Sequence, residues 1–60
     1  MTVKEFLEKQ VKYFREASYE YPEAHHKHQY YKGSAVAYEI MLKDMPTKAL
    51  NMHMYDEVIG

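Results

Sequence analysis

Two amphipathic stretches, separated by Tyr21-Pro22, are the feature that most limits how this chain folds. The chain has 60 residues, and a chain of that length buries only about 60% of the surface that its unfolded form exposes. Domains below roughly 70–80 residues usually gain extra stability from disulfides, a metal or another chain. Because the sequence contains no cysteine, disulfides are excluded. The sequence therefore indicates self-association, a bound metal or a protein partner.

The first stretch predicts a helix over residues 3–19. Thr2 and Glu5 have the spacing of a capping box, in which each side chain accepts a hydrogen bond from the other residue's backbone N–H. Pro22 ends this helix, because a residue that precedes proline is disfavoured in the α conformation. The predicted buried face follows the three- and four-residue spacing of one side of a helix and consists of Val3, Phe6, Leu7, Val11, Phe14, Ala17 and Tyr21.

The second stretch predicts a helix over residues 23–44, with Pro22 in its first turn and Met45-Pro46 at its end. Its predicted buried stripe consists of Ala24, His28, Tyr31, Ala35, Tyr38, Leu42 and Met45. A short connection between two helices favours an antiparallel arrangement. The expected fold class is therefore all-α, a two-helix antiparallel hairpin in which residues 1–60 form a single domain.

Residues 47–60 carry two competing patterns. Leu50, Met52 and Met54 alternate with polar residues, as in a β-strand, but a two-helix protein has no strand to pair with, so this pattern requires a second chain. Alternatively, Thr47 caps a short third helix that carries Leu50, Met54 and Val58. We expect the short helix.

The charge balance excludes some classes of function. Eight basic and nine acidic residues give a net charge of -1, which argues against binding driven by neutralisation of phosphates. No apolar run approaches the ~18–20 residues that span a bilayer, and the lack of cysteine fits a cytoplasmic location. The acidic residues are scattered, and Ser18 and Ser34 occupy ordinary helix positions, so we expect neither an enzyme nor a cofactor.

Three histidines follow Glu23 in the sequence. On a helix, His25 and His28 would be neighbours, but zinc needs three or four ligands and one helix supplies two. We therefore expect a solvated turn at His25, His26 and His28 and no metal site. A metal- or pH-responsive binding protein is the alternative, because histidine changes its charge between pH 5 and 8.

Gly33 lies inside the second predicted helix, where glycine costs about 1 kcal/mol relative to alanine. With Ser34, Ala35 and Ala37 it forms a surface of small residues that permits another backbone to approach closely. We expect Gly33 and Ala37 to mark the crossing of the first helix over the second. A crossing between two chains and a kink are the alternatives.

The pattern Tyr31-x-Gly33-x-x-x-Ala37-Tyr38-x-x-x-Leu42 resembles one found in small helical-hairpin proteins encoded by bacteriophages and prophages. The resemblance covers residues 31–42. The proteins of that group have no functional site in common, so no site residue is carried over to this chain. The resemblance implies a non-enzymatic protein that forms oligomers and blocks a host protein, such as a component of antiviral defence.

Seven tyrosines in 60 residues favour protein binding, because tyrosine is enriched at interface hot spots. The expected partners are a second copy, giving a four-helix-bundle-like dimer, and an unidentified host protein. A small nucleic-acid regulator that uses Lys27 and Lys32 is a second alternative. The candidate protein-binding residues are Tyr30, Tyr31, Tyr38, Met52, Met54 and Tyr55.

The metal-free expectation predicts that a chelator leaves both the helical circular dichroism signal and the oligomeric state unchanged. A structural zinc contributes folding free energy directly, so its removal would unfold so small a chain. Replacing His25 and His28 together by glutamine is likewise expected to cost little stability at neutral pH. Loss of helicity on chelation, restored by stoichiometric zinc, would contradict this expectation.

Overall fold

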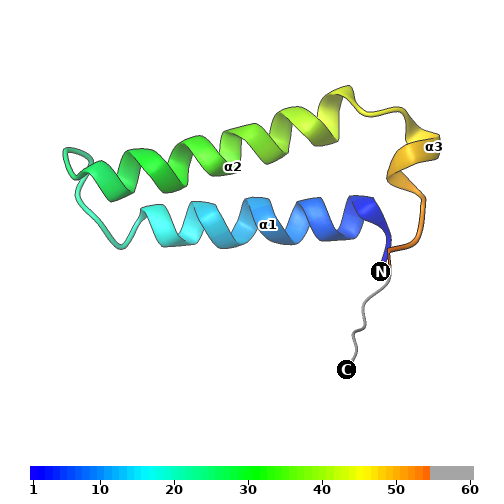
Figure 1. The fold of residues 1–60 in the computed structure, drawn as a ribbon. Helices are drawn as coiled ribbons and strands as arrows, with labels where there is room; N and C mark the ends of the chain where they lie inside the picture. Colours follow the sequence, from blue (N-terminus) through cyan, green and yellow to red (C-terminus); the bar gives the residue numbers. More distant parts are fainter. Residues whose placement is uncertain (55–60) are drawn as a thin grey trace.

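The computed structural model describes residues 1–54 of the chain. It contains α1 (Val3–Ser18), α2 (His26–Asp44) and a single-turn α3 (Thr47–Leu50). Figure 1 shows α1 and α2 side by side in opposite directions, with α3 at the open end of the hairpin. The predicted all-α, two-helix antiparallel hairpin is therefore confirmed.

The N-terminus of α1 has the predicted capping box. The Glu5 N–H donates to Thr2 Oγ1 at 3.1 Å, and the Thr2 N–H donates to Glu5 Oε1 at 2.8 Å. Two of the backbone donors that a helix N-terminus leaves without intrahelical partners are satisfied in this way. The helix ends at Ser18, one residue before the predicted end.

The start of α2 was predicted three residues too early. The His25 N–H donates to the Pro22 carbonyl at 2.8 Å, which closes a turn over residues 22–25. His25 itself is extended and caps the helix, because its Nδ1 accepts from the Lys27 N–H at 3.1 Å. Pro22 thus belongs to the turn and not to the first turn of the helix. The predicted end of α2 is confirmed at Asp44, before an extended Met45.

The segment after α2 combines a helical turn with an extended stretch. The N-cap of α3 is Pro46 and not Thr47. The expected short helix is confirmed only over Thr47–Leu50. Beyond it, His53 forms an antiparallel bridge with Thr2, flanked by hydrogen bonds from Val3 N–H to the Met52 carbonyl (2.9 Å) and from Met54 N–H to the Met1 carbonyl (2.8 Å). The extended stretch therefore pairs with the N-terminus of its own chain. A second chain is not required, and Val58 lies outside the described residues.

The core is a narrow seam between α1 and α2. Within residues 1–54 the buried apolar side chains are Leu7, Val11 and Ala35, and Leu7 is only 2% exposed. The molecule measures 12 Å along its shortest axis, which is about one helix diameter of ~10–12 Å. The hairpin is thus a single layer with two open broad sides. Among residues 1–54 there is no helix with the length and apolar character needed to cross a membrane.

The capping box predicts a pH-dependent stability that can be assigned to one carboxylate. The hydrogen bond from the Thr2 backbone, followed by smaller contributions from its hydroxyl, the N-terminal charge and Lys9, lowers the pKa of Glu5 from 4.5. A lowered folded-state pKa stabilises the protein above the unfolded-state pKa, and this contribution is lost as the pH falls through the folded value. Between pH 6 and 3 we expect the melting temperature to fall more for the wild type than for Glu5→Gln.

The matched control is Glu8→Gln, one turn further into α1. Melting curves followed by circular dichroism at a series of pH values provide the measurement. Parallel pH profiles for the wild type and Glu5→Gln would contradict the assignment.

Candidate protein-binding surface

Aromatic rings from both long helices form a continuous array. Phe14 of α1 stacks with Tyr31 and Tyr38 of α2, at centroid distances of 6.0 and 5.7 Å. Tyr13 contacts the edge of Phe14 at 5.1 Å, and Tyr30 contacts the edge of Tyr31 at 5.3 Å. Tyr13 and Tyr30, at the two outer ends of this array, are 61% and 65% exposed. The array therefore crosses the whole width of the hairpin from solvent to solvent.

The connection between the helices extends this array. The Tyr21 ring stacks on Tyr31 at 6.0 Å and lies 5.0 Å from the His25 ring. Lys27 Nζ lies 5.5 Å from the centroid of Tyr21, within the range of a cation–π contact. This end of the array thus carries the one positive charge that touches it among the described residues.

We call the side that carries these rings the aromatic face. Its residues follow the helical spacing of three and four, and Lys27, at the connection end of α2, is the charged side chain that contacts its rings. On α1 and the connection they are Phe6, Gln10, Tyr13, Phe14, Ala17 and Tyr21. On α2 and just after it they are Tyr30, Tyr31, Ser34, Ala37, Tyr38, Met41 and Met45. A shallow depression of about 200 Å³ between Tyr13, Tyr21 and Tyr31 is bordered by Glu16 and Glu20.

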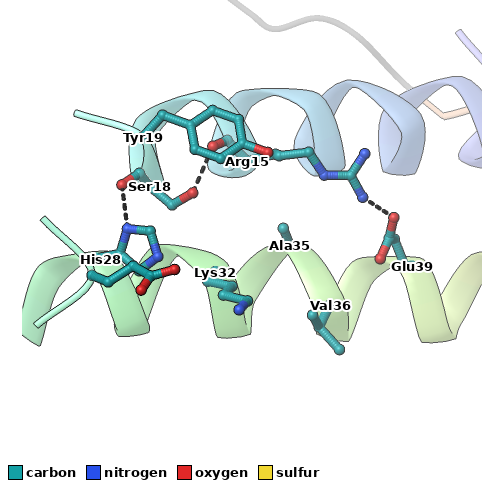
Figure 2. Close-up of a pocket in the computed structure, with 9 residues that line it drawn as sticks. Arg15, Ser18, Tyr19, His28, Lys32, Ala35, Val36 and Glu39 are labelled. Carbon is teal, nitrogen blue, oxygen red and sulfur yellow. Dashed lines mark hydrogen bonds and ion pairs between the residues drawn. The ribbon is translucent and has the colours of Figure 1, made fainter. Parts of the chain in front are cut away.

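The opposite broad side is charged. A groove of about 330 Å³ runs between the helices there, and Arg15 forms an ion pair with Glu39 across it (Figure 2). Both side chains are about half exposed, and exposed ion pairs contribute little to stability. Lys32 and Glu23 line the same groove. Charges of both signs at these positions favour the exposure of this side of the hairpin to water.

His28 joins the two helices at the connection end. Its Nδ1 lies 2.7 Å from the Ser18 carbonyl oxygen and 3.1 Å from that of Tyr21, and Figure 2 shows the ring directed at Ser18. Because a carbonyl only accepts hydrogen bonds, Nδ1 carries the proton. His28 is 7% exposed. It therefore links α2 both to the last carbonyl of α1, which also accepts from the Tyr21 N–H at 3.3 Å, and to a carbonyl of the connection.

Ser18 and His28 do not form a nucleophile and base. The Ser18 hydroxyl donates to the Arg15 carbonyl at 2.6 Å, and His28 contacts the Ser18 carbonyl and not its hydroxyl. Nucleophilic catalysis requires the base to lie within reach of the hydroxyl proton. Both side chains therefore make structural contacts at the end of α1.

The expected histidine turn is solvated at His26 but not at His28, which is buried, as its place in the predicted stripe of the second helix indicated. His25 and His28 do not share a helical face either, because His25 precedes α2 and its Nδ1 faces the Lys27 N–H. His26 is exposed and stacks on His25 at 4.6 Å. Over residues 1–54, no group of three or more potential ligands is arranged to hold a metal ion.

The predicted binding residues fall into two places. Tyr30, Tyr31 and Tyr38 meet on the aromatic face, although Tyr31 and Tyr38 are half-buried by their ring contacts. Met52 and Met54 are exposed at the open end of the hairpin, beside the Thr2–His53 bridge. Tyr55 lies outside the described residues. The structure thus groups the tyrosines and separates them from the methionines.

The crossing predicted within one chain at Gly33 and Ala37 is wrong. Both residues are exposed, and a Cβ atom built on Gly33 meets nothing within 4 Å. The small residue that faces α1 is Ala35, at 3% exposure (Figure 2). This result does not test the alternative of a crossing between two chains.

Three tyrosine and phenylalanine rings of the array were absent from the predicted site. Phe14 and Tyr21 were assigned to the buried stripe of the first helix, and Tyr13 was assigned no role. A signal was present in the sequence, because Phe6, Gln10, Tyr13 and Ala17 form a charge-free line at spacings of four, three and four. No comparable signal marks the capping role of His28, which depends on a contact ten residues away.

Comparison with protein-family models, with curated proteins and with solved structures gives no match to this chain. The functional argument therefore rests on the geometry of the two broad sides. The likeness to phage-encoded hairpins stays a prediction.

Because His28 is buried and bonded to two carbonyls, its replacement is expected to cost stability, in place of the small cost expected from the sequence for His25 and His28 together. His28→Leu replaces the imidazole with an apolar side chain of similar size and removes the N–H that donates to two carbonyls. An unsatisfied buried polar group costs about 1–3 kcal/mol. His26→Leu, two residues earlier on an exposed position, is the control and is expected to change stability little. Urea unfolding of both variants measures the difference. Equal losses would show that the carbonyl contacts of His28 contribute nothing.

Proposed function

We propose that this chain is a non-enzymatic protein-binding module that contacts its partner through the aromatic face. One observation carries the proposal. An uncharged array of contacting rings crosses both helices and ends in two tyrosines that are more than 60% exposed. A solvated surface does not need such an arrangement.

The physical properties of the array suit a protein interface. Phe14, Tyr31 and Tyr38 are held by stacking, so ordering them on binding costs little conformational entropy. Tyrosine supplies a large apolar body with a polar tip, and tyrosine is enriched among interface hot spots. Glu16, Glu20 and Lys27 border the rings. A polar border around an apolar centre is the usual anatomy of a binding surface.

The alternatives draw less support from the same contacts. Lys27 is engaged with the Tyr21 ring, and Lys32 lines a groove with Glu23 and Glu39, so neither lysine contributes to a concentrated positive surface for nucleic acid. His25 and His28 make capping and carbonyl contacts. The more specific role of a phage-type inhibitor of a host protein rests on the resemblance of residues 31–42 alone.

A pair of matched substitutions tests the proposal. Tyr13→Glu places a charge on the aromatic face, and Tyr19→Glu makes the same exchange at a residue that lines the charged groove and is 73% exposed. Immobilised chain is used to capture partners, either another protein or a further copy, from cells that produce it. Loss of a hot-spot tyrosine costs about 2 kcal/mol or more, which is roughly a thirtyfold loss of affinity.

We expect Tyr13→Glu to abolish capture and Tyr19→Glu to retain it, with both variants keeping the helical circular dichroism signal of the wild type. Capture that is equally sensitive to both substitutions would place binding elsewhere. Capture that is insensitive to both would exclude the aromatic face.

A further inference from the structure

We propose that a second copy of this chain covers the aromatic face. The two hairpins stack with their connections at opposite ends, so that α1 meets α1 and α2 meets α2, each antiparallel, in a four-helix bundle. This inference rests on the proposed function, because it names the partner that the same face binds. It is argued from the layer structure, the side-chain sizes, the register of the helices and the bordering charges.

The single layer requires a second one. Compact domains consist of two or more packed layers around a core, whereas this hairpin is 12 Å thick and buries few apolar side chains within residues 1–54. A standard interface buries about 800 Å² on each partner. Tyr13 and Tyr30 alone expose about 200–300 Å², given ~150–250 Å² for each aromatic residue. These two side chains therefore supply roughly a third of the area of a standard interface, and the half-buried rings between them and the exposed Met41 add to it.

The side chains of α1 are complementary to themselves in an antiparallel pair. On the aromatic face the order along α1 is Phe6, Gln10, Tyr13 and Ala17. A two-fold axis midway between Phe6 and Ala17 places the large Phe6 opposite the small Ala17 of the second copy. The same axis places Gln10 opposite Tyr13. Large residues thus meet small ones, which lets two helices interdigitate.

The side chains of α2 repeat this property. Along α2 the order on the aromatic face is Tyr30, Ser34, Ala37 and Met41, with Tyr38 beside them. A two-fold axis between Ala37 and Tyr38 places Ser34 opposite Met41 of the second copy. The axis also brings Ala37 close to Ala37 of the second copy. Ala37 and Ser34 are the small residues that allow the approach of the second α2.

One axis serves both helix pairs. Phe14 stacks on both Tyr31 and Tyr38, so it lies level with the residues midway between them on α2. Because the helices are antiparallel and rise equally per residue, the point midway between Phe6 and Ala17 on α1 lies level with Ala37 and Tyr38 on α2. The two axes derived separately from the two helices therefore coincide. A closed two-fold dimer requires this coincidence.

The charges at the border agree with the antiparallel pairing. Lys9 and Glu16 lie on the outer edge of α1, one on each side of the proposed axis, and both are exposed. In the dimer each Lys9 lies within about one helical turn of Glu16 of the second copy. The symmetry forms this opposite-charge pair twice. A parallel α1 pair would place Lys9 beside Lys9 and Glu16 beside Glu16, which is repulsive.

Single cysteines introduced into this cysteine-free chain test the geometry. Ala37→Cys lies next to the proposed axis, so the two thiols of a dimer come within disulfide range, for which Cα atoms are about 4.4–6.8 Å apart. Val36→Cys is the control, since it lies on the adjacent residue, turned by about 100° around the helix, and lines the charged groove. We expect rapid air oxidation to a covalent dimer for Ala37→Cys and slow, concentration-dependent oxidation for Val36→Cys.

The oligomeric state provides a second readout that needs no substitution. We expect light scattering at micromolar concentration to give twice the chain mass of 7.2 kDa. The melting temperature is expected to fall over about a hundredfold dilution, because a dimer's stability depends on protomer concentration. We expect Tyr13→Glu to give a monomer and Tyr19→Glu a dimer.

Failure of this inference is distinguishable from failure of the proposed function. A monomeric wild type, or a dimer in which Val36→Cys cross-links faster than Ala37→Cys, would overturn the second copy on the aromatic face. Capture of another protein that is lost in Tyr13→Glu would still support the proposed function in that case. A monomeric chain whose captured proteins are indifferent to Tyr13→Glu would overturn both.

Discussion

The narrow seam between α1 and α2 is the constraint on which the rest of this structure depends. Leu7, Val11 and Ala35 are buried there, and the small Ala35 lets the two helices approach each other closely. A seam this narrow holds two helices in one layer but covers neither broad side. Polar contacts therefore close both ends of the hairpin. At the connection His28 bonds to the Ser18 carbonyl of α1, and at the open end Thr2 forms a bridge with His53.

The seam also separates the chemistry of the two broad sides. One flank carries charged residues beside the exposed Tyr19 and Val36, and Arg15 forms an ion pair with Glu39 across its groove. Residues on the other flank are uncharged and centre on the stack of Phe14 with Tyr31 and Tyr38. Water solvates the first side at little cost, whereas the second side gains free energy when it is covered. The proposed function follows from this difference, which neither helix has alone.

The three neighbouring histidines illustrate how tertiary contacts divide similar residues. His25 ends an extended segment and caps α2, His26 stays exposed, and His28 is buried against the end of α1. Sequence spacing treated them as one cluster, because the helix was predicted to begin before them. Once the turn at Pro22 delays α2 to His26, the expected shared face of His25 and His28 no longer exists.

The sequence by itself determined the elements whose causes are local: the capping box at Thr2 and Glu5, the C-terminal end of α2, that of α1 to within one residue, and the hairpin that follows from a short connection. These depend on residues within a few positions of one another, so spacing is enough to predict them. Only the tertiary structure decided that Gly33 is exposed and not at the helix crossing, that His28 reaches Ser18, and that residues 52–54 pair with the N-terminus. Each of these depends on the rotation of α2 about its axis or on contacts between distant residues. Both are set by how whole helix surfaces fit together, which a single helix's periodicity does not specify.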